Sequence, residues 1–169
     1  PKIEDIVNQI YKRLKNSKSS RLIYVGAGTS ARIGVQDGVE LYPTFGWPLK
    51  RVYFIIAGNK QALLKPIEDS EDDIEEARRQ FKKAKIKEDD VIIGLSASGK
   101  TPFTIELLKQ SKKKGALTIA IINNFDVSLE SFCDNVLILN TGYEIVAGST
   151  RLKAGTAQKI CLNLISTLL

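Results

Sequence analysis

Three short loops carry the residues of this chain that are best suited to chemistry. They comprise residues 26–30 (GAGTS), 96–101 (SASGKT) and 148–150 (GST), and each comes where an expected strand gives way to an expected helix. Such loops present backbone N–H groups and hydroxyls at the positive end of a helix dipole, which is where a phosphate binds. One loop alone could be a simple helix cap, but three in one small domain predict a phosphorylated ligand that several helix ends hold together.

The elements expected to position these loops are strands that alternate with helices. Short apolar runs predict strands at residues 22–25, 52–56, 91–95, 117–122 and 136–139. Amphipathic spacing predicts helices at about residues 2–15, 30–39, 102–114 and 153–169, with a charged helix that ends near residue 83. Pro43 and Pro48 predict a loop after the second helix. Apolar strands in alternation with helices are typical of an α/β fold, a parallel sheet with helices on both faces, which binds ligands at the carboxyl ends of its strands.

The composition of the 169-residue chain argues against several classes of protein. It has no histidine, which excludes His-based catalytic triads and His-ligated metal sites. Its two cysteines are too few for a disulfide framework, so a cytoplasmic protein is predicted. No apolar run approaches the ~20 residues that cross a bilayer, and the lysine runs at residues 82–87 and 109–114 lack interleaved aromatic residues. We therefore expect neither a membrane nor a nucleic acid as a partner.

Two of the loops also match nucleotide-binding patterns, and each match lacks its second motif. Residues 26–31 fit the dinucleotide fingerprint G-x-G-x-x-A, but the next strand ends at Ile56 without the carboxylate that holds a ribose. Residues 94–101 fit the P-loop G-x-x-x-x-G-K-T, but no later strand ends in the aspartate that a nucleotidase needs for its metal. Both patterns stay open as alternatives to a phosphosugar site.

Taken together, the three loops resemble the sugar isomerase (SIS) domain, whose phosphosugar signature S-x-S-G-x-T stands at residues 96–101. Within that superfamily the chain is most similar to the N-acetylmuramic acid 6-phosphate etherase family, on residues 26–46, 97–102 and 148–159. The resemblance covers residues 21–169 and implies a flavodoxin-like three-layer α/β/α fold. It implies one SIS domain over residues 1–169, without the helical C-terminal domain of the family.

The resemblance implies a carbon–oxygen lyase that converts N-acetylmuramic acid 6-phosphate to N-acetylglucosamine 6-phosphate and D-lactate by elimination and water addition. It places the catalytic acids at Glu40 and Glu71. Glu71 is expected to remove the proton at C2, and Glu40 to protonate the leaving ether oxygen and later activate water, although these roles could be exchanged. From the residues alone, Glu71 could instead belong to an acidic cluster at a helix start. Glu40 is expected to end a helix beside apolar neighbours, a surround that keeps a catalytic acid protonated.

The resemblance also implies how a phosphorylated amino sugar is bound. Helix ends and hydroxyls can neutralise a phosphate, so we expect no metal and no cofactor. The expected phosphate cradle is Ser96, Ser98, Gly99 and Thr101, and the expected contacts from the other loops are Gly28, Thr29, Ser30, Ser149, Thr150 and Lys153. Active sites of the family form at dimer interfaces, so a homodimer is expected.

Two other functions stay open. Glucokinase regulatory proteins share the fold and the phosphosugar loops but act as binding modules, so the chain could be a non-catalytic sugar-phosphate-binding module. An aldose–ketose phosphosugar isomerase shares the abstraction of the C2 proton. Carboxylates at both catalytic positions, Glu40 and Glu71, favour the lyase over the binding module.

Overall fold

The computed structural model describes residues 2–125 and 127–169, and within them five strands form one parallel sheet in the order β2-β1-β3-β4-β5. The strands are β1 (Leu22–Gly26), β2 (Val52–Ile56), β3 (Val91–Ser96), β4 (Leu117–Ile122) and β5 (Asn135–Ile138). The three inner strands are buried along their whole length, as continuous apolar runs predict for a sheet covered on both faces.

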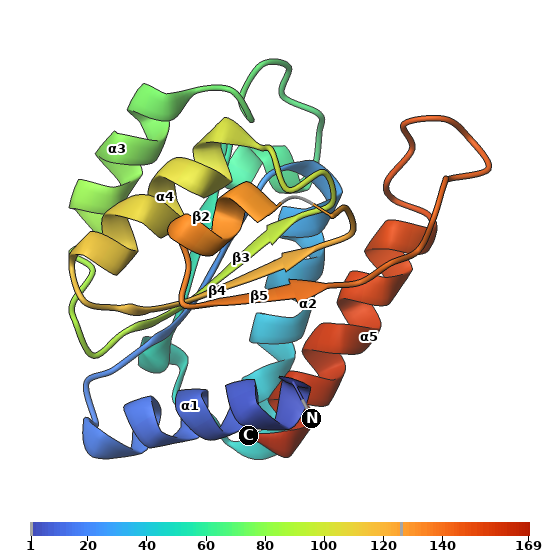
Figure 1. Cartoon of the computed structure of the whole chain (residues 1–169). Helices are drawn as coiled ribbons and strands as arrows, with labels where there is room; N and C mark the ends of the chain where they lie inside the picture. The colour runs from blue at the N-terminus through green and yellow to red at the C-terminus, as the bar shows by residue number, and fades with distance from the viewer. Residues whose placement is uncertain (1, 126) are drawn as a thin grey trace.

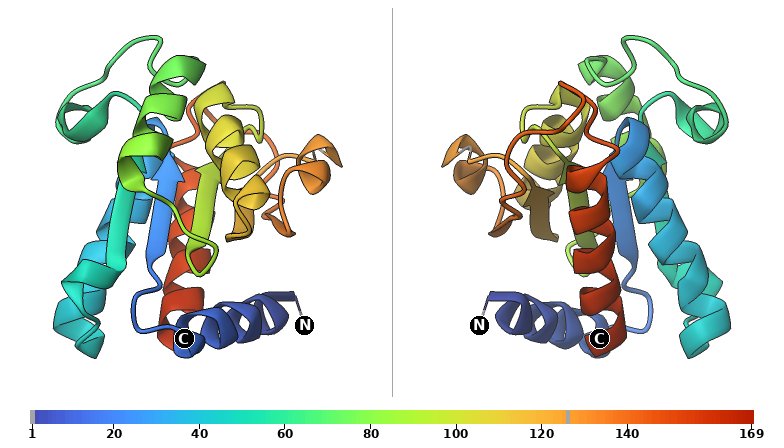
Figure 2. Two further views of the ribbon diagram at one scale, coloured as in Figure 1. Left: turned by 90° about the vertical axis from the view of Figure 1, so that its left-hand side faces the viewer. Right: turned by 90° about the vertical axis from the view of Figure 1, so that its right-hand side faces the viewer.

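Helices cover both faces of the sheet (Figures 1 and 2). The helices are α1 (Lys2–Asn16), α2 (Gly28–Phe45), α3 (Ile74–Ala84), α4 (Pro102–Lys113) and α5 (Lys153–Leu168). Alternate residues of β3 belong to two separate cores: Ile93 packs with α1, α2 and α5, whereas Ile92 packs with α3 and α4. This arrangement confirms the predicted three-layer α/β/α fold. No helix within residues 2–125 and 127–169 has the length and apolar character needed to span a bilayer.

Helix α2 is longer than the sequence predicts. We expected it to end near Val39, with a loop around Pro43, but it continues through the proline to Phe45. Gly46 ends it in the left-handed conformation, with φ of 68° and its N–H donating to the carbonyl of Tyr42. Burial of Leu41 against the sheet offsets the hydrogen bond that Pro43 cannot make. Glu40 therefore lies inside a helix, and the expectation that it ends one is wrong.

Short 3₁₀ helices in the connections were also missed: η1 (Leu49–Arg51), η2 (Asn59–Leu63) and η3 (Val127–Ser131). Segments of this length depend on tertiary contacts more than on local propensity. They leave the order of the strands and helices as predicted.

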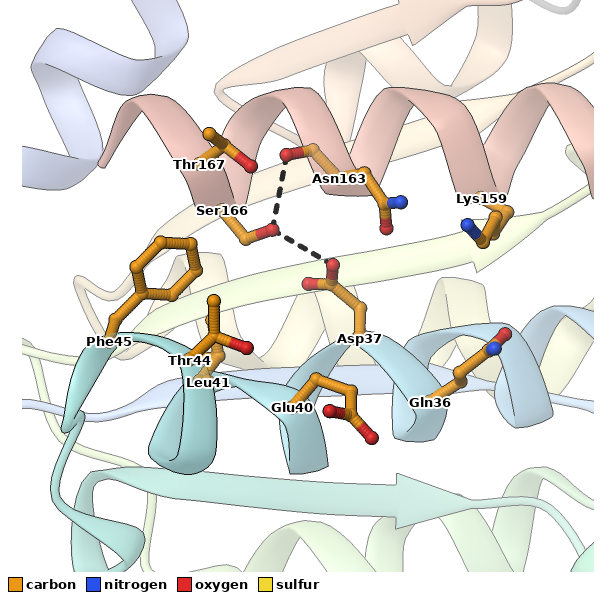
Figure 3. Close-up of a pocket in the computed structure, with 10 residues that line it drawn as sticks. All are labelled: Gln36, Asp37, Glu40, Leu41, Thr44, Phe45, Lys159, Asn163, Ser166 and Thr167. Atoms are coloured by element: carbon orange, nitrogen blue, oxygen red, sulfur yellow. Dashed lines mark hydrogen bonds between the residues drawn. The ribbon is translucent and has the colours of Figure 1, made fainter.

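A buried carboxylate joins α2 to the strand and the helix beside it. The hydroxyl of Tyr24 on β1 donates to Asp37 Oδ2 at 2.7 Å. The hydroxyl of Ser166 on α5 donates to Asp37 Oδ1 at 2.9 Å, a bond drawn in Figure 3. Burial, and then the nearby carboxylate, raise the pKa of Tyr24 well above its usual value. Tyr24 therefore stays protonated and acts as a hydrogen-bond donor that fixes the orientation of α2.

We expect Asp37→Ala to lower the free energy of unfolding by about 1–3 kcal/mol, because the buried Tyr24 hydroxyl loses its acceptor. Denaturant unfolding measures this change. The same substitution in a Tyr24→Phe background should cost less, since no hydroxyl is left unpaired there. An equal cost in the two backgrounds would contradict the role given to the Asp37 carboxylate.

Candidate functional site

The three glycine loops meet at the carboxyl edge of the sheet, around a cavity of about 230 Å³. The predicted residues that line it are Gly28, Thr29 and Ser30 from the first loop, Ser96, Ser98 and Thr101 from the second, and Thr150 from the third. The ends of β1 and β3 lie side by side here, because parallel strands place their carboxyl ends at one edge, and Gly148 and Thr150 reach the cavity from the long segment before α5. Of the predicted binding residues, three are not in its lining: Gly99, Ser149 and Lys153.

The second loop is organised by the Ser96 hydroxyl at the end of β3. This oxygen accepts the N–H of Gly99 at 3.1 Å and lies 2.9 Å from Thr101 Oγ1. Gly99 has a φ of 73°, a conformation that glycine adopts without strain, and it lets the loop curl back on itself. The Thr101 side chain makes no capping bond to α4 within the described residues. Pro102 has no N–H, and the N–H of Phe103 is bonded to the carbonyl of Glu71, so α4 offers the cavity the positive end of its dipole beside the loop hydroxyls.

The first loop leaves the start of α2 in a similar state. Its N-cap residue is Ala27, which has no side chain that could cap the helix. Gly26 brings the end of β1 close to the neighbouring loop: a Cβ there would lie 3.1 Å from the carbonyl of Leu95. Thr29 and Ser30 follow in the first turn and face the same cavity as Ser96. The start of α2 therefore presents N–H groups to this cavity, and the start of α4 presents the positive end of its dipole.

The third loop differs, because the start of α5 already holds a carboxylate. Glu144 Oε2 accepts the N–H of Lys153 at 3.0 Å, and Glu144 Oε1 accepts the N–H of Ala154 at 2.9 Å. Lys153, which we expect to contact the ligand, lies outside the lining of the glycine-loop cavity and borders an apolar groove on α5 with Leu152 and Ile160. Glu144 was not predicted as a site residue. Its signal was a predicted helix start without a Ser, Thr, Asp or Asn cap, preceded by one carboxylate in the loop.

Glu71 lies at the border of the glycine-loop cavity and of a neighbouring cavity of about 280 Å³. Its backbone carbonyl accepts the N–H of Phe103 at 3.0 Å, which ties the segment before α3 to the first turn of α4. The cap of α3 is Asp73, whose Oδ1 accepts the N–H of Glu76 at 2.7 Å. The alternative that Glu71 belongs to a helix-start cluster is therefore less favoured, because Asp73 makes that capping bond.

Glu40 lies well away from this cavity. Gly28 and Glu40 belong to the same helix, and a rise of about 1.5 Å per residue separates them by about 18 Å along its axis. Glu40 lines a different pocket of about 240 Å³ between α2 and α5, with Asp37, Lys159 and Asn163 (Figure 3). Its side chain is exposed, so the single chain does not supply the apolar surround that we expected. Within one chain, Glu40 and Glu71 cannot both reach a ligand in the glycine-loop cavity.

Arg32 on α2 lies beside the first loop and binds the backbone of η2. Its Nη2 donates to the carbonyl of Ala62 at 2.8 Å and its Nε to the carbonyl of Leu63 at 3.3 Å. These bonds hold η2 against α2 at the edge of the cavity that Glu71 borders. Arg32 thus has a positioning role in this structure.

We expect Ser96→Ala to weaken the binding of a phosphosugar by about 10- to 100-fold, because the hydroxyl that organises the second loop is lost. Titration calorimetry with a sugar 6-phosphate measures the affinity. The matched control is Ser111→Ala in α4, since the buried Ser111 hydroxyl has no hydrogen-bond partner within the described residues. Equal affinities of Ser96→Ala and Ser111→Ala would contradict the cradle.

Comparisons with known proteins place the chain among phosphosugar-related sequences. A family model described as "Glucokinase regulatory protein N-terminal SIS domain" matches residues 3–112. The N-acetylmuramic acid 6-phosphate etherase of Caldanaerobacter subterraneus subsp. tengcongensis is 46% identical over 99% of this chain and 54% of the relative. That of Deinococcus radiodurans is 43% identical over 100% of this chain and 55% of the relative. The chain thus spans about half the length of the curated relatives it matches.

Solved structures resemble the chain in fold. A phosphoheptose isomerase from Francisella tularensis has a TM-score of 0.73 at 13% identity, over 99% of this chain and 84% of that chain. The Vibrio vulnificus NanR protein complexed with ManNAc-6P has a TM-score of 0.64 at 14% identity, over 97% of this chain and 53% of that chain. At these identities the likeness concerns the arrangement of the sheet and its helices.

Proposed function

Because the chain belongs to the family of the glucokinase regulatory protein N-terminal SIS domain, and because etherases match it along nearly its whole length, we propose that it is the phosphosugar-binding part of a lyase. The lyase converts N-acetylmuramic acid 6-phosphate to N-acetylglucosamine 6-phosphate and D-lactate. The observation that carries this proposal is one cavity lined by the starts of two helices, three serine and threonine hydroxyls of the second loop, and the carboxylate-bearing Glu71.

The phosphate is assigned to the second loop and the start of α4. Ser96, Ser98 and Thr101 supply hydroxyls there, and the start of α4 supplies the positive end of its dipole. Thr29 and Ser30 at the start of α2 face the same space and suit the phosphate or the sugar hydroxyls. This set of donors neutralises a dianion without a metal ion.

The proposed reaction begins once the sugar ring has opened to expose an aldehyde, which makes the C2 proton acidic. Glu71 takes that proton, the C3–oxygen bond breaks, and Glu40 gives its proton to the departing lactate oxygen. The product is an aldehyde conjugated with a C2–C3 double bond. Water then adds at C3 while Glu40 takes a proton from it and Glu71 returns one to C2. Each such acid or base typically contributes about 10²- to 10⁴-fold.

The distance between the two glutamates supports an active site shared by two protomers. If Glu71 acts from the chain that holds the phosphate, then Glu40 of the partner subunit completes the site. The outer face of α2 around Glu40 carries Val39, Tyr42 and Phe45, whose side chains are 46%, 54% and 50% exposed. A homodimer that buries this face would surround Glu40 with apolar groups, as a catalytic acid requires.

The expectations of one SIS domain over residues 1–169 and of a cytoplasmic location stay predictions. Cys133 and Cys161 are both buried and unpaired, and burial raises the pKa of Cys133 to about 12 and that of Cys161 to about 11. Thiols of this kind are unreactive packing residues, which supports a reducing compartment.

Incubation of the purified chain with N-acetylmuramic acid 6-phosphate, followed by mass spectrometry, tests the proposal. Release of D-lactate with formation of N-acetylglucosamine 6-phosphate is the expected result. Binding of the phosphosugar without turnover would favour the non-catalytic binding module, the alternative that the family model's description supports. Exchange of the C2 proton with solvent deuterium, without lactate, would indicate an isomerase.

A further inference from the structure

The segment between β5 and α5 leaves the sheet and returns to it with few anchors. It rises beyond the carboxyl edge of the sheet above the start of α5 (Figures 1 and 2). Tyr143 and Ile145, on either side of Glu144, are 97% and 91% exposed and do not pack against the described core. Its internal hydrogen bonds are local, as from the N–H of Gly142 to Asn140 Oδ1 and from the N–H of Ser149 to the carbonyl of Val146.

Glu144 provides the anchor that the apolar residues do not. Both of its carboxylate oxygens accept N–H groups from the first turn of α5, those of Lys153 and Ala154. The N-cap residue Leu152 offers no side-chain cap, so these N–H groups depend on a partner from elsewhere in the chain. A carboxylate at this place also suits the positive end of the helix dipole. The loop is thereby closed into a ring that runs from residue 144 to residue 154.

This ring contains the part of the loop that faces the cavity. Gly148 and Thr150 line the cavity, and both lie between Glu144 and the helix start that Glu144 holds. The carbonyl of Thr150 accepts the N–H of Gly155 at 2.9 Å, which fixes the end of the ring near the helix. The Glu144 carboxylate fixes the other end. The position of Thr150 relative to Ser96 across the cavity therefore depends on the Glu144 carboxylate.

We propose that Glu144 is a positioning residue whose carboxylate holds residues 148–150 against the ligand. The same carboxylate occupies the start of α5, so the phosphate binds at the starts of α4 and α2 instead. This inference rests on the proposed function, because it concerns the same cavity. The hydrogen bonds from the N–H groups of Ala154 and Lys153 lower the pKa of Glu144. The side chain is therefore charged at neutral pH and repels a second anion from this helix end.

The test compares Glu144→Ala with Glu144→Gln, which keeps one acceptor oxygen, and with Glu88→Ala as a matched control. Glu88 is an exposed carboxylate at the opposite, amino edge of the sheet. For Glu144→Ala we expect faster hydrogen exchange at the amides of residues 153 and 154 and a KM raised by about 10- to 100-fold. The kcat should change by less than about threefold, because no proton-transfer group is removed. Glu144→Gln should lie between Glu144→Ala and the wild type.

Affinity for N-acetylglucosamine 6-phosphate, measured by calorimetry, separates this inference from the proposed function. If the wild type binds this sugar but releases no lactate, the proposed function fails, while a weaker affinity of Glu144→Ala still supports the inference. Unchanged exchange at residues 153 and 154 would overturn it, because Glu144 would not hold the helix start. Faster exchange with unchanged affinity and KM would also overturn it, because the loop would not contribute to binding.

Discussion

Replacement of Glu71 by glutamine is expected to lower the rate of lactate release by about 10²- to 10⁴-fold. The amide has nearly the same shape as the carboxylate but cannot accept the C2 proton. The backbone bond from Phe103 to the carbonyl of residue 71 does not involve the side chain, so the segment should keep its position beside the second loop. The variant should also fail to exchange the C2 proton with solvent deuterium, since that exchange needs only the base.

The matched control for this prediction is Glu68→Gln. Glu68 is an exposed carboxylate of the same segment and lines the neighbouring cavity, but not the one that the glycine loops form. Lactate release and deuterium exchange, followed by mass spectrometry, should both stay within about threefold of the wild-type rates. A Glu71→Gln variant with the rates of Glu68→Gln would remove Glu71 from the mechanism.

Glu40→Gln is expected to reduce lactate release over the same range of about 10²- to 10⁴-fold, but to leave deuterium exchange at C2 in place. The reason is that Glu71 can still take and return the C2 proton while the ether oxygen lacks its acid. Glu40 is exposed in the single chain, so the substitution should also leave the free energy of unfolding within about 0.5 kcal/mol. The reverse pattern, with exchange lost in Glu40→Gln and kept in Glu71→Gln, would mean that the two roles are exchanged.

The fold followed from the sequence where apolar pattern and topology agree. The run of residues 91–95 could only be a strand buried on both faces, and parallel strands necessarily bring the loops that follow them to one edge. The end of α2 could not be predicted in this way. Pro43 normally indicates a loop, and only the packing of Leu41 against the sheet and the left-handed turn at Gly46 carry the helix to Phe45.

The site was predictable in its parts but not in its distances. Hydroxyl-rich loops at strand ends indicate a phosphate cradle from local chemistry alone, and the predicted Ser96, Ser98 and Thr101 do line one cavity. The separation of Glu40 from that cavity depends on the length and direction of a whole helix. The contact of Glu144 with the start of α5 depends on the path of a long loop. Neither the position of Glu40 nor the contact of Glu144 can be predicted from the residues next to it in the sequence.

A subunit-complementation experiment tests the central claim most directly, namely that two protomers share each active site. Glu40→Gln and Glu71→Gln chains are co-refolded in equal amounts, and lactate release is measured against each variant alone. In a mixed dimer one site keeps both glutamates and the other has neither, so random assembly should restore about a quarter of the wild-type activity. A mixture no more active than the two separate variants would contradict the shared site.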